Sequence, residues 1–294
     1  MREPTATLVP GPPRLPELHA RESPQKNFLC GAFWGALVLQ AAGIEEVEEG
    51  PVDQDLVAVL SGTSLPTGDP ATFVPAGASP RRDYRLHIPT ATDVERSGTA
   101  TSALARVIED LSSKALAVVP VAGPWTGDTV LDLVEAAGST APASVLVANL
   151  RSGALWGSRP PAATLLAHLA GASVEPPPPD WDVGHFVTIV GSLTGARRAL
   201  VLVRDTYPTL GWGGYHLQPA EALAAALSRG DGREGGVLCV CEGEEAQVLR
   251  SRLEDAAYEL RHWDNGTPDP LAERAPAYGA RTAFATSPKS ETGR

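Results

Sequence analysis

The distribution of apolar and polar positions divides the chain into a helix-rich first half and a strand-rich second half. Residues 30–42 are almost all apolar, which predicts a buried helix that ends at Gly43. Residues 64–92 are rich in Pro, Gly and Thr and predict a loop. Apolar residues behind capping side chains predict further helices at residues 53–60, at residues 92–113, and from Thr126 or Asp128 through Ala137.

Short runs of β-branched residues predict the strands of the second half. Residues 186–190 and 199–203 are two such runs joined by a polar, Gly-containing segment, so they favour a β-hairpin. Residues 174–182 contain four consecutive prolines and predict an extended surface loop before this hairpin. Other expected strands are residues 116–120, 143–149 and 236–240, and other expected helices are residues 160–169, 219–228 and 244–261. The grouping of helices before strands indicates an α+β fold.

The same pattern predicts one domain with two irregular ends. The Pro-rich residues 1–24 indicate an extended arm. Residues 25–262 contain the periodic segments and form the expected single domain. Residues 263–294 are polar and Pro-rich with little periodicity, which predicts a flexible C-terminal tail.

Composition and charge exclude several classes of protein. The 294 residues are 43% hydrophobic and have a formal net charge of −11, so the basic face that nucleic acids and anionic membranes require is not expected. The chain contains no apolar run of about 18 residues, the length of a membrane span, and its N-terminus lacks the apolar core of a signal peptide. We therefore expect a cytoplasmic protein without nucleic-acid or membrane partners.

The cysteine content also favours a reduced compartment. The three cysteines, Cys30, Cys239 and Cys241, are too few and too scattered for a disulfide framework. Cys239 and Cys241 are two residues apart on an expected strand, so they should point to the same face of the sheet. The chain has neither an HExxH motif nor paired Cys and His ligands at zinc spacing, and we expect no metal and no cofactor.

A cysteine, a histidine and an aspartate, in that order, form the most specific chemical signal in the chain. Cys30 stands where a loop meets an apolar helix, and a helix N-terminus stabilises a thiolate. His185 begins one strand of the predicted hairpin and Asp205 ends the other, so their side chains can meet. Each residue alone has an ordinary structural explanation, as a small buried thiol, a core imidazole or a turn carboxylate. Together they suggest a nucleophile, its base and the group that orients the base.

These segments resemble the bacteriocin-processing peptidases, the double-glycine leader peptidases of the papain-like cysteine peptidase superfamily. The stretch from Cys30 to Gly43 is similar to the nucleophile helix of that family. Residues 185–191 and 201–205 are similar to the paired strands that carry its histidine and aspartate, and the resemblance extends over residues 25–230. It implies a papain-like fold in which the N-terminus of the cysteine helix packs on an antiparallel sheet that carries the other two residues.

The resemblance further implies an oxyanion donor upstream of the nucleophile. Gln25 has this place, although it lies five residues before Cys30, one fewer than the family pattern. Asn27 is the alternative amide donor, and the backbone N–H of Cys30 is the expected second donor.

Other residues suggest the walls of a substrate cleft. Gly31 follows the cysteine and lets the backbone approach a substrate closely. Three tryptophans lie in Gly-rich segments or near His185, and we expect them at the edge of the cleft: Trp156, Trp181 and Trp212.

Three functions remain open at this point. A thiol hydrolase would form an acyl-enzyme through Cys30, with peptide cleavage as the expected reaction and leader removal from a natural-product peptide as a setting. An acyltransferase would use the same triad but pass the acyl group to an amine. A non-catalytic scaffold would keep the fold and bind a peptide or protein partner, and the displaced Gln25 favours this alternative. The expected ligand is a peptide or acyl substrate in each enzymatic case.

Overall fold

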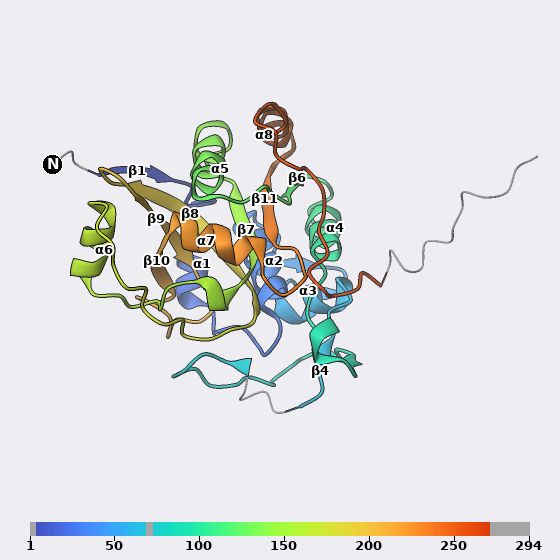
Figure 1. The fold of residues 1–294 in the computed structure, drawn as a ribbon. Helices are drawn as coiled ribbons and strands as arrows, with labels where there is room; N and C mark the ends of the chain where they lie inside the picture. The colour runs from blue at the N-terminus through green and yellow to red at the C-terminus, as the bar shows by residue number, and fades with distance from the viewer. Residues whose placement is uncertain (1–3, 69–72, 271–294) are drawn as a thin grey trace, which may run out of the picture.

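An antiparallel sheet of seven strands forms the centre of the structure, a computed structural model that describes residues 4–68 and 73–270 (Figure 1). The strand order is β10-β9-β8-β7-β11-β6, and β1 pairs with the far end of β8. The strands are β1 (Thr5–Leu8), β6 (Leu116–Val121), β7 (Val145–Arg151), β8 (Gly184–Thr194), β9 (Ala199–Arg204), β10 (Tyr215–Pro219) and β11 (Gly236–Glu242).

Helices cover both faces of this sheet. Figure 1 shows α7 in front of the strands, with α1 and α2 behind them. Helices α5, α7 and α8 pack on one face, α1 to α4 pack on the other, and α6 contacts β9. The helices are α1 (Leu15–Arg21), α2 (Cys30–Ala41), α3 (Gln54–Leu60), α4 (Thr101–Leu111), α5 (Gly127–Thr140), α6 (Ala162–Leu169), α7 (Ala220–Ser228) and α8 (Gly243–Asp255). None of these helices combines the length and the apolar composition that a membrane span needs.

Alternate residues of the central strands face two separate hydrophobic cores. On β7, Leu146 and Ala148 contact the core of α5, α7 and α8, whereas Val145 and Val147 contact the core of α1 to α4. Cys239 and Cys241 both face the first of these cores, as their spacing predicts. The α+β architecture with an antiparallel sheet is therefore present.

Most elements of the domain interior follow the sequence pattern. The hairpin of β8 and β9 is confirmed, and the apolar helix α2 ends at Ala41, before Gly43 in a left-handed conformation at φ 87°. Asp53 caps α3 by accepting a hydrogen bond from the N–H of Leu56 at 2.9 Å. Thr126 and Thr129 form a capping box at the start of α5.

Two predicted helices differ from the structure. The helix expected at residues 92–113 is divided into a short 3-10 turn, Val94–Arg96, and helix α4, because Gly98 between them has a φ of 111°. The helix expected to reach residue 261 ends at Asp255, close to Ala257 with a φ of 60°. Minor two-residue pairings also occur, namely β2 (Glu46–Val47) with β3 (Gly50–Pro51) and β4 (Leu65–Pro66) with β5 (Thr90–Ala91).

The prediction of an extended arm at residues 1–24 is wrong for the described part of that segment. Residues 5–8 form β1 on the sheet, and residues 15–21 form α1 against α2. Gly191 permits the pairing of β1 with β8, because a Cβ at that position would lie 2.3 Å from the carbonyl oxygen of Thr7. The strand is only four residues long and stands between Pro4 and Pro10, so the sequence pattern did not mark it.

The predicted C-terminal tail begins too early. Trp263 is buried in the core of α1 to α4 and donates from Nε1 to Oδ1 of Asn149 at 3.3 Å. Asn265 donates from Nδ2 to the carbonyl oxygen of Thr99 at 2.9 Å, and Asp269 pairs with Arg106 at 3.0 Å. Residues 263–270 are therefore part of the folded domain, and the rest of the expected tail lies outside the described residues.

Replacing Trp263 tests whether the C-terminal segment holds the domain together. Trp263→Ala removes a large side chain that is 5% exposed, and the cavity should lower the free energy of unfolding by about 3–5 kcal/mol. Urea unfolding followed by circular dichroism measures this loss. Val248→Ala, on the exposed side of α8, is the control and should change stability by less than about 0.5 kcal/mol. Equal small effects of both substitutions would show that residues 263–270 do not stabilise the domain.

Candidate active site

Helix α2 places Cys30 beside the sheet. Cys30 is the first residue of the helix and is partly exposed, whereas most of the helix behind it is buried. Trp34, one turn later, donates from Nε1 to the carbonyl oxygen of Phe186 on β8 at 3.1 Å. A Cβ at Gly31 would lie 3.1 Å from the Cβ of Thr99 and 3.3 Å from the ring of Phe186, so the glycine allows this close packing. The role of Gly31 in the structure is thus to seat the helix on β8.

The β8–β9 hairpin brings His185 and Asp205 together. His185 is the second residue of β8, and Asp205 follows β9 directly. His185 donates from Nε2 to Oδ1 of Asp205 at 3.1 Å, and the backbone N–H of Tyr207 donates to the same oxygen at 3.2 Å. Both side chains are almost fully buried. Because Nε2 bonds to Asp205, Nδ1 is the ring nitrogen that is available to interact with the Cys30 thiol.

The electrostatics of this group favour a charged imidazole. Burial opposes the charged form of His185, but the Asp205 carboxylate and the Cys30 side chain outweigh it and raise the pKa of His185 from 6.5 to about 10. Burial also disfavours the Asp205 carboxylate, yet its histidine neighbours hold the pKa of Asp205 below its ordinary value. The raised pKa of His185 stabilises the fold fully below about pH 6.5, and this contribution is lost as the pH rises toward about 10.

Trp181 covers the histidine from the Pro-rich loop. Its ring packs edge-on against the ring of His185, with centroids 5.0 Å apart, and against Tyr207 at 5.5 Å. This cover limits the access of water to the bond between His185 and Asp205. Trp181 also lines the cavity that contains Cys30, so the structure places it where the sequence predicted.

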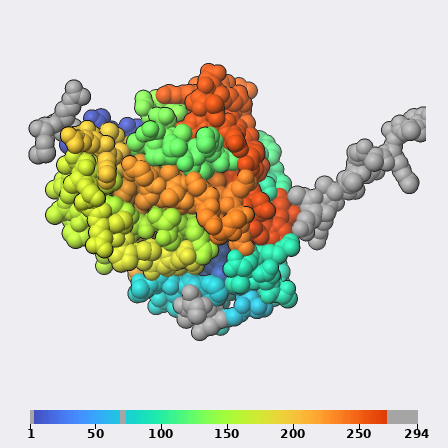
Figure 2. Space-filling view, viewed as in Figure 1, coloured from blue at the N-terminus to red at the C-terminus, as the bar shows by residue number. Residues whose placement is uncertain are grey.

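A cavity of about 180 Å³ opens above Cys30 and His185. In Figure 2 the hollow lies between the yellow loop before β8, the teal residues near 95 and the orange residues near 230, with blue atoms at its floor. Its aromatic wall includes Phe28 and Trp181. Its polar wall includes Arg229 and Arg233, whose charges are matched by Asp231 at 2.6 Å and Glu95 at 2.8 Å.

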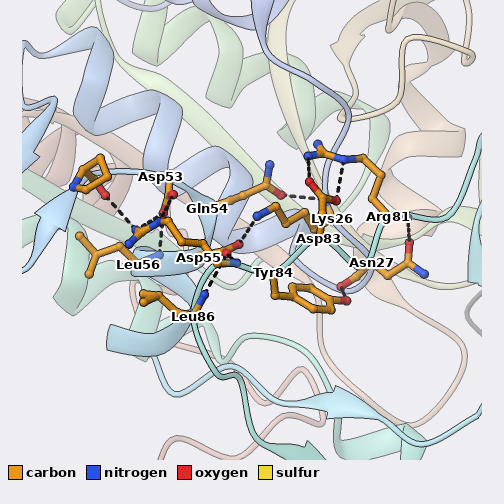
Figure 3. A network of polar contacts seen from close by, with 12 residues as sticks. Lys26, Asn27, Asp53, Gln54, Asp55, Leu56, Arg81, Asp83, Tyr84 and Leu86 are labelled. Atoms are coloured by element: carbon orange, nitrogen blue, oxygen red, sulfur yellow. Dashed lines mark hydrogen bonds and ion pairs between the residues drawn. The ribbon is translucent and has the colours of Figure 1, made fainter.

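The loop before Cys30 is anchored by a buried ion pair. Figure 3 shows Lys26 reaching from this loop to Asp55 on α3, and the two charged atoms are 2.8 Å apart. The backbone N–H of Lys26 donates to Oε1 of Gln54 at 2.6 Å. Asp55 also accepts hydrogen bonds from the backbone N–H groups of Arg85 and Leu86. The chain then turns through Phe28, whose φ of 66° is unusual for a bulky residue, and enters α2.

Asn27 belongs to this anchor and does not line the cavity. Its side-chain Oδ1 accepts a hydrogen bond from the N–H of Arg81 at 3.0 Å, and its backbone carbonyl accepts one from the hydroxyl of Tyr84 at 3.0 Å (Figure 3). The predicted role of Asn27 as an alternative oxyanion donor has no support in this placement. Asn27 instead has a structural role, because its two bonds tie the loop before α2 to residues 81–84.

Gln25 lines the cavity with Cys30 and is held by the segment after Asp205. The hydroxyl of Thr206 donates to Oε1 of Gln25 at 2.6 Å, and the backbone N–H of Gln25 donates to the carbonyl oxygen of Thr206 at 3.4 Å. The bond to Oε1 leaves the Nε2 end of the amide as the donor. The structure therefore keeps Gln25 in the same cavity as Cys30, although its spacing from Cys30 is short by one residue.

The other two predicted tryptophans lie away from this cavity. Trp156 is buried, and its backbone N–H and carbonyl both bond to the side-chain amide of Gln218 at 2.7 and 2.9 Å. Trp212 is exposed at the turn that leads into β10 and does not line the cavity. Trp212 is close to Asp205 along the chain, but it lies in the turn that leads into β10, and Trp156 is held by Gln218 of that strand.

Sequence reasoning missed several polar neighbours of the three residues. Lys26, Thr206 and His216 each support the site through contacts with residues distant in sequence, so spacing alone could not find them. His216 ends the aromatic, Gly-rich segment 211–216, and its place beside Asp205 depends on the pairing of β10 with β9. Over residues 4–68 and 73–270, we find no group of three or more His, Cys, Asp or Glu side chains arranged to hold a metal ion.

Comparison with known proteins identifies the family of the chain. The model of DUF6885, described as a family of unknown function, matches residues 9–264, and the chain therefore belongs to this family. The matched range contains Cys30, His185 and Asp205. No curated protein matches the chain.

Breaking the buried ion pair tests whether it anchors the loop before the cysteine. Lys26→Met keeps the length of the side chain but leaves the buried Asp55 carboxylate without its cation, which should lower the free energy of unfolding by about 3–5 kcal/mol. Urea unfolding measures the loss. Arg21→Met breaks the exposed pair with Glu17 and is the matched control, with an expected loss below about 1 kcal/mol. A loss for Lys26→Met no larger than that of the control would contradict the anchoring role.

Proposed function

We propose that this member of the DUF6885 family is a thiol hydrolase of the papain-like type that cleaves peptide bonds. The observation that carries the proposal is the position of His185, which bonds to Asp205 through one ring nitrogen and interacts with the Cys30 side chain. A nucleophile beside a base, with a carboxylate that orients the base, is what acyl transfer through a thiol requires.

Activation begins with a proton held on His185. The raised pKa keeps the imidazole charged at neutral pH, and an adjacent imidazolium stabilises the thiolate of a cysteine. The helix N-terminus at Cys30 adds partial positive charge from its unpaired N–H groups. Asp205 holds the proton on Nε2 when the imidazole is neutral, so that Nδ1 can exchange a proton with the thiol or with substrate.

The reaction follows from these positions. The Cys30 sulfur attacks the carbonyl carbon of the substrate, and the new C–S bond forms as the carbonyl oxygen takes a negative charge. The C–N bond then breaks, and the imidazolium of His185 gives its proton to the leaving amine. In the second half His185 takes a proton from water, the hydroxide attacks the thioester carbon, and a carboxylic acid leaves as the thiol is restored.

Two donors are available for the negative oxygen. The backbone N–H of Cys30 is at the first position of α2, where a helix has no internal acceptor for it. The Nε2 group of Gln25 is the second, since Thr206 occupies the other end of this amide. The antiparallel sheet beneath the cysteine helix and the order Cys, His, Asp along the chain support the papain-like assignment.

Selective alkylation tests the nucleophile without knowledge of the substrate. Iodoacetamide at pH 7 should modify Cys30 first, because burial raises the pKa of both Cys239 and Cys241. Peptide mass mapping over a time course measures the three rates separately. His185→Gln should slow the alkylation of Cys30 at least about tenfold, since the imidazolium is lost.

The same measurement separates an enzyme from a binding scaffold. If Cys239 or Cys241 reacts as fast as Cys30, the thiol is not activated and the proposal fails. In a library of fluorogenic peptidyl amides, Cys30→Ala should lower kcat by about 10⁴-fold or more. Hydrolysis that continues at the original rate in Cys30→Ala would also overturn the assignment.

Substitution of Gln25 tests the oxyanion donor. Gln25→Ala should lower kcat on those amides by about 100- to 1000-fold with little change in KM, because the lost bond forms only in the transition state. Thr206→Val keeps the shape but removes the hydroxyl that orients the amide, and we expect a smaller loss of about tenfold.

A double variant shows whether Thr206 acts through Gln25. Gln25→Ala with Thr206→Val should lose no more activity than Gln25→Ala alone, because the hydroxyl then has no amide to orient. Additive losses would assign Thr206 a separate role. If Gln25→Ala leaves kcat unchanged while Cys30→Ala abolishes turnover, the oxyanion donors lie elsewhere.

A further inference from the structure

His216 is a buried histidine that the proposed mechanism does not use. It is the second residue of β10 and is 2% exposed. Its Nε2 lies 3.6 Å from Oδ2 of Asp205, on the opposite carboxylate oxygen from His185. This distance is longer than a hydrogen bond, and Nε2 has no hydrogen-bond partner in the described part of the chain.

The neighbouring Gln218 determines which ring nitrogen of His216 carries the proton. Oε1 of Gln218 accepts a hydrogen bond from the backbone N–H of Trp156 at 2.7 Å, and Nε2 of Gln218 donates one to the carbonyl oxygen of Trp156 at 2.9 Å. These two bonds to one peptide group fix the orientation of the amide. Nε2 of Gln218 is also 3.0 Å from Nδ1 of His216, so it must donate there. Nδ1 is then an acceptor, and the neutral imidazole carries its proton on Nε2, next to Asp205.

The geometry points to His216 as a positioning residue for the triad, a second histidine that holds Oδ2 of Asp205 while Oδ1 holds His185. With a donor on each oxygen, the carboxylate cannot rotate about its bond to Cβ without losing one of them. A buried N–H that lacks a partner gains a hydrogen bond by a small movement toward Oδ2, and catalytic hydrogen bonds are often long before substrate binds. The role of His216 in catalysis rests on the proposed thiol chemistry, whereas its contact with Asp205 is independent of that proposal.

Other ionisable groups surround this pair and enter any pH dependence. From α1, His19 donates from Nε2 to the backbone carbonyl of Asp205 at 2.7 Å, and burial lowers its pKa. Arg204 precedes Asp205 and lies over the ring of Tyr215, 5.3 Å from its centroid. Tyr207 has a pKa raised by burial. These groups lie close enough to Asp205 and His185 to contribute to any pH profile measured at the site.

The tautomer of His216 can be measured directly in the full chain. Long-range ¹H–¹⁵N correlation spectra of protein labelled with ¹⁵N-histidine, recorded at pH 7, distinguish the two neutral forms and the imidazolium. His216→Phe assigns the signals. We expect the neutral form with the proton on Nε2. A signal from the Nδ1–H form or from the imidazolium would overturn the inference.

The effect on the triad is measured by the pH profile of Cys30 alkylation with iodoacetamide. In His216→Phe, a less firmly held Asp205 stabilises the imidazolium of His185 less well, so the rate at pH 7 should fall about tenfold and the midpoint of the profile should rise about one pH unit. His216→Gln keeps an N–H donor at the same reach and should recover part of the rate. A profile of His216→Phe identical to that of the wild type would also overturn the inference.

A second buried histidine provides the matched control. His168 packs against Trp156 and lies close to Glu221 instead of Asp205, so His168→Phe should leave the profile unchanged. If His216→Phe does not fold, two other measurements still test the inference. It is supported if His216→Gln has the same profile midpoint as the wild type and if the wild-type spectrum shows the Nε2–H form. If Cys30 is unreactive in the wild type, the proposed function fails, whereas the tautomer spectrum still tests the contact.

Discussion

A buried carboxylate organises this structure. Asp205 is 2% exposed, and the cost of taking an ionised group out of water is offset only when several donors surround it. The groups around it come from separate elements: His185 of β8 and the backbone of Tyr207 donate to Oδ1, and His216 of β10 lies 3.6 Å from Oδ2. The backbone carbonyl of the same residue accepts a bond from His19 of α1. The elements must therefore assemble in one arrangement, and that arrangement places an imidazole next to the thiol.

The position of Cys30 depends on contacts of a different kind. Helix α2 is held against β8 by the bond from Trp34 to the Phe186 carbonyl, one residue after His185. Its N-terminus is entered through a loop that the pair of Lys26 and Asp55 anchors to α3. A shift of the helix by one turn would move Cys30 about 5 Å, which is enough to take it out of reach of His185. The position of Cys30 thus depends on both the packing of α2 behind it and the ion pair before it.

The sequence predicted which three residues meet at the candidate site better than it predicted the residues that support them. Cys30, His185 and Asp205 were found because a helix start and two strand ends are local features, and hairpin geometry alone brings the last two together. The strands and helices of the domain interior followed for the same reason, since their apolar period is local. Strand β1 and the packed residues 263–270 were missed because long-range contacts hold them, namely pairing with β8 and burial of Trp263.

The polar supports escaped prediction for a related reason. Asn27 and Gln25 are the same kind of side chain two residues apart, yet one bonds to Arg81 and the other to Thr206. Nothing in the local sequence distinguishes them, because the difference lies in the partners that folding supplies.

The bond between Gln25 and Thr206 has a further consequence for how the site is coupled. Thr206 follows Asp205 directly, so the turn that orients the base also orients the predicted oxyanion donor. The Gln25 backbone N–H donates back to the Thr206 carbonyl, which gives the two segments a second tie at 3.4 Å. The loop before Cys30 and the turn after Asp205 are therefore joined by two hydrogen bonds, although Gln25 and Thr206 are 181 positions apart in the sequence. Because both bonds would be strained if one segment moved alone, we expect the Gln25 amide and the Asp205 carboxylate to keep their relative positions while this pair of bonds remains.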